Sequence, residues 1–223
     1  MASRSERRTG AACAIAGSVL LLLGTALHPM GADPNDAVAA FTEYAAARLW
    51  VASHLMQLAG VALMMGALLF LADQLESERS RPWTRIAAAG AIASLALATA
   101  LQAVDGVALK AMVDVWSAAP AAQKDGAFHA AFAVREVEVG LASMLSLSLG
   151  LTVSLYGVAL MLDRARSNWM GGLALVGGVP TAAAGVVMAY AGFSGPAMAI
   201  SMPAGAILLA WMFVLGIQMW RRG

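Results

Sequence analysis

The residues best suited to metal or proton chemistry are three histidines, His28, His54 and His129, which lie in or beside long apolar runs. An ionisable side chain within a membrane span is costly, so it indicates a partner or a function. Imidazoles combined with a carboxylate are typical ligands of Zn, Fe or Cu, and histidines can also ligate a haem. The sequence contains no HxxxH or HExxH pair. A metal site is therefore expected to draw on separate segments, with candidate ligands His28, His54, His129 and Glu136.

Other polar residues lie at a depth similar to that of the histidines. The depth is estimated by counting residues from the inner end of each apolar run. A helix rises about 1.5 Å per residue, so about 20 residues cross the hydrocarbon core. The count places most of these residues near one level. They form the predicted ligand-binding set His28, His54, Gln57, Gln102, Asp105, Arg135 and Glu138. Glu138, Asp105 and His54 are the candidate catalytic residues, because a desolvated carboxylate beside a histidine suits proton transfer.

Spacing adds information about the residues around Glu138. Arg135 and Glu138 are three apart on a predicted helix and can form an ion pair. His129 and Glu136 are seven apart and share a face. Glu136 and Glu138 point about 200° apart, so they cannot both enter one small site.

These residues must be positioned by membrane-spanning helices. The chain has 223 residues, of which 61% are hydrophobic and 12% charged, whereas a soluble domain averages about 25% charged. Apolar stretches of about 20 residues predict an all-α, integral membrane six-helix bundle, a single transmembrane domain over 1–223. The predicted spans are 11–28, 49–72, 84–104, 131–162, 169–191 and 198–220. The lone cysteine, Cys13, excludes an internal disulfide, and nucleic acid is not an expected partner.

The distribution of basic residues predicts the orientation. With a cytoplasmic N-terminus, the inner segments hold Arg4, Arg7, Arg8, Arg79, Arg81, Arg85, Arg164, Arg166, Arg221 and Arg222. The outer segments hold Arg48, Lys110, Lys124 and Arg135. This excess follows the positive-inside rule and predicts that both termini are cytoplasmic in a plasma-membrane protein.

The two outer connections, 28–47 and 105–129, are predicted loops that carry short helices. One helix is expected after the DPND sequence that ends at Asp36, and another over 106–118. The tryptophans near span ends are expected to anchor the bundle at the membrane interface; they are Trp50, Trp83, Trp169, Trp211 and Trp220. The polar cluster is expected on helices one to four, with helices five and six as apolar support.

Four interpretations of the polar cluster remain open. The residues could form only interhelical pairs, as in a structural or accessory subunit that binds another membrane protein. They could hold a divalent metal or a haem. They could line an outward-facing pocket for a small hydrophobic or lipid-like molecule, with or without catalysis. They could also belong to a transporter, although the deepest strongly polar groups, Gln57 and Gln102, carry no charge.

Three stretches carry a resemblance to a known group of sequences. They are HPMGADPND from residue 28, RLWVASHLMQLAGVALMMGALLFLADQL from residue 48 and AVREVEVGLASMLSLSLGLTVSLYGVAL from residue 133. On these stretches the chain resembles uncharacterised, actinobacterial-type bacterial multi-pass membrane proteins of unknown function. The matching stretches centre on His54, Gln57, Arg135 and Glu138. The resemblance implies a small helical bundle and no particular activity.

Overall fold

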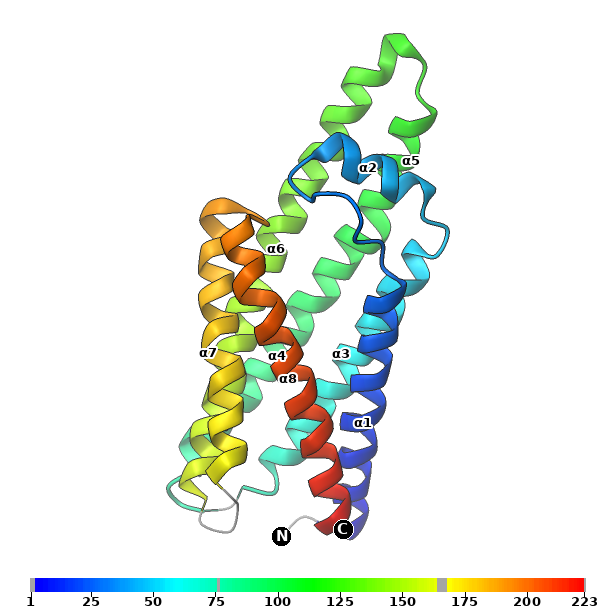
Figure 1. Ribbon diagram of the computed structural model, residues 1–223. Coiled ribbons are helices and arrows are strands. Elements are labelled where there is room, and N and C mark those ends of the chain that lie inside the picture. The colour runs from blue at the N-terminus through cyan, green and yellow to red at the C-terminus, as the bar shows by residue number, and fades with distance from the viewer. Residues whose placement is uncertain (1–2, 76, 164–167, 223) are drawn as a thin grey trace.

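The helices of this protein run roughly side by side and form an elongated bundle (Figure 1). The computed structural model describes residues 3–75, 77–163 and 168–222, which fold as helices and short connections. The long helices are α1 (Arg4–Leu27), α3 (Trp50–Ala72), α4 (Arg81–Gln102), α6 (Ala121–Leu162), α7 (Asn168–Ala191) and α8 (Gly195–Arg222). The shorter elements are α2 (Ala37–Ala46), the π-helix η1 (Ala103–Leu109) and α5 (Lys110–Ala118).

Six of the described helical segments are long and apolar enough to cross a membrane, which confirms the predicted number of spans. The chain is therefore a multi-pass helical membrane protein. The start of α1 and the end of α8 lie at the same end of the bundle, as an even number of spans requires (Figure 1). We call this end the inner end and the opposite end the outer end. The cytoplasmic placement of the termini stays a prediction, and two of its basic residues, Arg164 and Arg166, lie outside the described residues.

The connection 105–129, predicted as a loop with one short helix, is almost entirely helical. Helix α4 continues through η1 into α5, and the helical segment spans Arg81–Ala118. The chain reverses only at Ala119 and Pro120, where proline lacks the N–H that a continuing helix needs. Helix α6 starts directly afterwards and has 42 residues, so its first turns project beyond the other helices (Figure 1).

Helix α2 lies across the outer end of the bundle (Figure 1). It starts where the DPND sequence predicts, because the Asp36 side chain accepts a hydrogen bond from the Ala39 N–H and caps the helix. Its buried Phe41 and Tyr44 pack with Trp50, Leu109 and other residues of a separate aromatic cluster. This cluster fixes α2 over the start of α3.

Small residues allow the closest helix contacts in the bundle. Gly150 and Gly157 of α6 face Gly178 and Gly171 of α7, with backbone against backbone. The stripe of small residues along α6, which includes Gly140, Gly150 and Gly157, therefore serves helix packing. Gly140, at the start of the same stripe, faces open space.

Two of the tryptophans predicted as interface anchors are buried instead. Trp211 is fully buried, and its indole N–H donates to the Met170 carbonyl at 3.0 Å. Trp50 is 1% exposed and belongs to the outer aromatic cluster. Trp83, Trp169 and Trp220 are 41–52% exposed, as interfacial residues are expected to be. Trp50 and Trp211 are buried because of how their helices are rotated about their axes. This rotation cannot be deduced from a position near the end of a span.

Candidate functional site

His54 is held between two acceptors at the outer end of α3. Its Nδ1 lies 2.7 Å from the carbonyl oxygen of Trp50, one turn earlier, and its Nε2 lies 3.0 Å from Oδ2 of Asp105. The imidazole is 2% exposed. Because a carbonyl oxygen can only accept, Nδ1 carries the proton of this bond. Nε2 therefore faces the Asp105 carboxylate in one of two states. It either has a free lone pair or carries a second proton, which the imidazole and the carboxylate share.

The π-helix η1 brings Asp105 to His54. The indole N–H of Trp50 donates to the Asp105 backbone carbonyl at 3.1 Å, which ties η1 to the start of α3. A Cβ atom on Gly106 would lie 2.6 Å from Cβ of His54, so only glycine permits this approach. Short π-helical segments are frequent at functional sites because they re-aim side chains within a helix. Here the segment directs Asp105 toward α3.

Removal of the Trp50 indole N–H should loosen this arrangement. Trp50→Phe leaves the Asp105 carbonyl without its indole donor, which costs about 1–3 kcal/mol when an acceptor is buried. We expect a lower melting temperature in detergent. The exposed Trp169→Phe serves as the control and should leave the melting temperature unchanged. Equal shifts in the two variants would contradict the role assigned to Trp50.

His28 completes a three-residue group. Helix α1 ends at Leu27, and the extended backbone at His28 turns the chain back over the outer end. The His28 ring centroid lies 5.0 Å from that of His54 and 4.7 Å from that of Trp50. One ligand atom from each of His28, His54 and Asp105 lies within 4.8 Å of the other two. Burial lowers the pKa of His28, and the neighbouring His54 lowers it further, which favours the neutral imidazole.

The chain around His28 is held by a carboxylate on α2. Both oxygens of Glu43 accept backbone N–H bonds, from Gly31 and Ala32, each at 2.9 Å. These two bonds tie the connection that follows His28 to α2. This role of Glu43 was not predicted from the sequence, because its partners lie in an irregular connection.

Arg135 and Glu138 form the buried ion pair that their spacing predicts. Arg135 Nη1 donates to Oε2 of Glu138 at 2.7 Å, and the two side chains are 8% and 5% exposed. The guanidinium group also lies 4.9 Å from the ring centroid of Phe193. Its second nitrogen donates to the Pro34 carbonyl at 3.4 Å. Arg135 therefore links α6 to two outer connections.

A cavity of about 310 Å³ separates the histidine group from this ion pair. Its polar lining residues are His28, Asp105, Glu43, Arg135 and Glu138. Its apolar and aromatic lining residues include Tyr44, Trp50, Phe193, Met30, Met198 and Met202. Met198 and Met202 belong to α8, so the last span contributes to the cavity wall and does more than support the bundle.

Comparison with protein-family models, with curated proteins and with solved structures found no match. The resemblance to actinobacterial-type membrane proteins therefore stays a prediction. The chemistry of the site must be argued from its own residues.

Gln57 and Gln102 pair with each other below the histidine group. Gln102 Nε2 donates to Oε1 of Gln57 at 3.2 Å. Neither residue lines the cavity. Gln102 Oε1 is buried without a hydrogen-bond partner among the described residues. The two amides link α3 to α4 next to the site and do not form a wall of it.

His129 and Glu136 lie apart from the other candidate metal ligands. The His129 side chain is 69% exposed, and its Nδ1 lies 2.9 Å from the Asp125 carbonyl oxygen on its own helix. Glu136 is exposed on α6, while Glu138 is buried, as the angle between them predicts. The structure therefore brings together His28, His54 and Asp105 of the predicted site residues, with Arg135 and Glu138 on the same cavity.

The aromatic residues of the site were not predicted from the sequence. Trp50 was assigned to the membrane interface, although it precedes His54 by four residues and shares its helix face. That spacing was the available signal. No comparable pattern in the sequence indicates that Tyr44, Phe193 and the methionines of α8 lie at the site. Their positions depend on how segments distant in the chain pack together.

Proposed function

We propose that this membrane protein binds a divalent transition metal ion at its outer end, with His28, His54 and Asp105 as ligands. The observation that carries the proposal is the convergence of the three ligand atoms within 4.8 Å. Two imidazoles and one carboxylate form a ligand set that suits zinc, copper or iron. With the orientation that the basic residues predict, the site would lie on the extracytoplasmic side of the plasma membrane.

The environment of His54 supports a metal ligand. A ligating histidine commonly donates its other ring N–H to a backbone carbonyl, which fixes the tautomer and the ring. His54 has this arrangement through Trp50. Metal ions bind a nitrogen lone pair, so an ion between Nε2 and Oδ2 would replace any proton that His54 and Asp105 share.

The second oxygen of Asp105 gives an independent indication. Oδ1 is buried and has no hydrogen-bond partner among the described residues. A buried carboxylate oxygen without a partner is costly. A metal ion bound by this carboxylate would remove the cost. Only a modest closure is needed, because ligands around zinc lie about 2.0–2.2 Å from the ion and His28 is already adjacent.

Charge balance in the cavity also favours a divalent cation. Its lining contains the three carboxyl groups of Glu43, Asp105 and Glu138 and one guanidinium group, that of Arg135, so with all three ionised the negative charges outnumber the positive by two. Uncompensated charge in a membrane-protein interior is unfavourable. A divalent ion would bring the site to neutrality.

Three protein ligands leave a coordination position free for a small molecule. Such an open position distinguishes catalytic and ligand-binding metal sites from closed structural ones. In this protein the position would face a cavity whose lining combines polar groups with Phe193, Met198 and Met202. A small amphiphilic molecule fits this lining, with its polar group toward the metal. A haem fits less well, because His54 Nε2 already faces Asp105.

Metal titration tests the proposal. Chelator-treated protein in mild detergent is titrated calorimetrically with zinc, and then with copper and manganese for selectivity. We expect one ion per chain and a higher melting temperature; saturation at 100 times Kd would stabilise the fold by about 2.7 kcal/mol. His54→Ala should abolish this binding, and Asp105→Asn should weaken it without removing side-chain volume.

The matched control is His129→Ala, which removes an exposed imidazole outside the group. It should bind the ion as the wild type does. A wild-type protein that binds no ion, or binds it equally well after His54→Ala, would contradict the proposal. That result would leave His54 and Asp105 as an interhelical pair in a structural subunit.

A further inference from the structure

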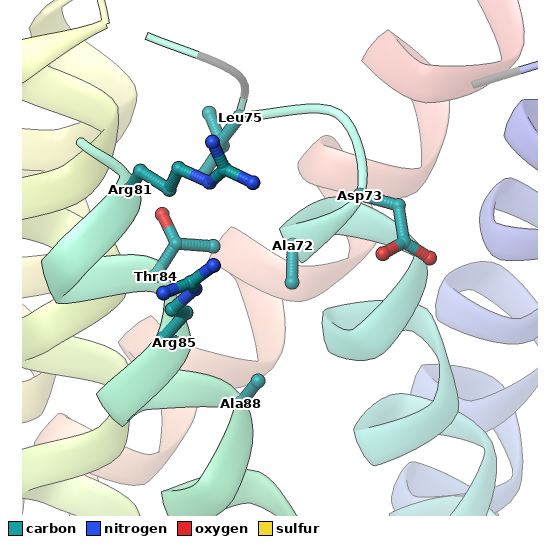
Figure 2. A pocket seen from close by; sticks show the side chains of 7 residues that line it. All are labelled: Ala72, Asp73, Leu75, Arg81, Thr84, Arg85 and Ala88. Atoms are coloured by element: carbon teal, nitrogen blue, oxygen red, sulfur yellow. The ribbon is translucent and has the colours of Figure 1, made fainter. Parts of the chain in front are cut away.

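A second cavity lies at the inner end of the bundle, far along α3 and α4 from the histidine group. It has a volume of about 590 Å³ and opens between the end of α3 and the start of α4 (Figure 2). Its lining consists of Ala72, Asp73, Leu75, Arg81, Thr84, Arg85 and Ala88. Because it lies at the other end of the spans, any role for it is independent of the metal site.

Two arginines dominate the charge of this cavity. Arg81 and Arg85 are four residues apart, and Figure 2 shows their guanidinium groups on the same side with Thr84 between them. Neither guanidinium group makes a hydrogen bond or ion pair with another described residue. Like charges at this spacing repel by about 0.2–0.5 kcal/mol. An anion bound between the two groups would replace repulsion with attraction.

Asp73, the one carboxylate among the described residues of the lining, does not neutralise the arginines. It projects from the end of α3 on the other side of the opening, away from both guanidinium groups (Figure 2). The start of α4 adds positive potential, because the N-terminal end of a 22-residue helix carries the positive end of its dipole. Among the described residues, the cavity therefore combines three sources of positive potential with one distant negative charge.

The other lining residues place this charge at the edge of an apolar surface. Leu75 is 2% exposed and Ala72 and Ala88 are partly buried, so the floor is apolar. Beside the cavity, Trp83 is 41% exposed and Ile86 is 56% exposed. Exposed tryptophan marks the headgroup level, and exposed isoleucine one turn deeper faces the acyl chains. The arginines thus lie where lipid phosphate groups lie.

We propose that this cavity binds the phosphate group of an anionic phospholipid, with Arg81 and Arg85 as its direct partners. The planar guanidinium group matches the geometry of phosphate oxygens and can donate two parallel hydrogen bonds. The lipid backbone would lie against Ala72 and Ala88, and the acyl chains would continue along the exposed face of α4. Anionic lipids are abundant on the cytoplasmic leaflet, which is the side that the basic residues predict for this end.

Native mass spectrometry in mild detergent tests the proposal. The protein is incubated with equal amounts of phosphatidylglycerol and phosphatidylcholine, and the retained lipid is measured. We expect phosphatidylglycerol to be retained preferentially. Each basic residue near the surface contributes about fivefold to anionic-lipid binding, so Arg81→Gln/Arg85→Gln should reduce the preference by about 10- to 30-fold.

The control removes the same charge from the same end of the bundle. Arg221→Gln/Arg222→Gln should keep the preference, because these arginines lie outside the cavity. If the double variant at the cavity does not fold, Arg85→Lys keeps the charge, removes the planar fork and should still lower the preference.

Three outcomes would overturn the proposal. They are equal retention of the two lipids by the wild type, an equal loss in the Arg221→Gln/Arg222→Gln variant, and displacement of phosphatidylglycerol by millimolar inorganic phosphate. The last outcome would assign the cavity to a free phosphate instead.

Discussion

Replacement of Arg135 with leucine is expected to lower the free energy of unfolding by about 3–5 kcal/mol, the typical cost of removing one partner of a buried ion pair. Glu138 is 4% exposed, and its described hydrogen-bond partner is the Arg135 guanidinium group. The leucine variant leaves this carboxylate buried beside Asp105 on the same cavity. Equilibrium unfolding in mixed micelles measures the change.

A second variant distinguishes destabilisation by an unpaired buried charge from destabilisation by lost packing. Arg135→Leu/Glu138→Leu removes both charges and should recover most of the stability, because a buried ion pair often contributes little more than an apolar pair of similar volume. Glu136→Gln, two residues from Glu138 and exposed, should behave as the wild type. A double variant no more stable than Arg135→Leu would show that the packing of Arg135 against Phe193 and Tyr44 dominates.

Gly150→Ala is expected to destabilise the bundle by at least about 1–3 kcal/mol, the usual cost of overpacking a close contact. The added Cβ would clash with the backbone nitrogen of Ala182 and would lie 2.6 Å from the carbonyl oxygen of Gly178. Both atoms belong to the backbone of α7, so no side chain can move aside. Helices α6 and α7 would have to separate along their contact. The melting temperature in detergent and the unfolding midpoint measure the effect.

Gly140→Ala provides a matched control on the same helix. A Cβ at Gly140 would meet no atom within 4 Å. The substitution should leave stability unchanged or raise it by up to about 1 kcal/mol, the difference in helix propensity between the two residues. If Gly150→Ala and Gly140→Ala change the melting temperature by the same amount, the close contact between α6 and α7 does not limit stability.

Much of the fold could be predicted from local patterns. The six spans follow from apolar stretches matched to the membrane thickness. The start of α2 follows from Asp36, whose side chain satisfies an N–H group of the first turn. The pairing of Arg135 with Glu138 follows from three-residue spacing on one helix. Each of these features depends on residues close together in the chain.

The helical path through 103–118 could not be predicted in the same way. A short helix over 106–118 was predicted within a loop, whereas the structure continues α4 without a break through η1 into α5. The indole of Trp50 and the ring of His54 hold η1 in place, from a segment about 50 residues earlier. Local propensity does not include such partners, and tertiary contacts outweigh it here.

The sequence alone determined that histidines, carboxylates and amides lie near one depth in the membrane, because depth follows from counting residues along each span. Which of them meet was decided by the tertiary structure, because side-chain direction depends on how each helix is rotated against its neighbours. Rotation and the η1 segment place His28, His54 and Asp105 together and leave Gln57 and Gln102 paired beneath them. The same packing turns Trp50 inward and brings Met198 and Met202 of α8 to the cavity, where no count of depth could place them.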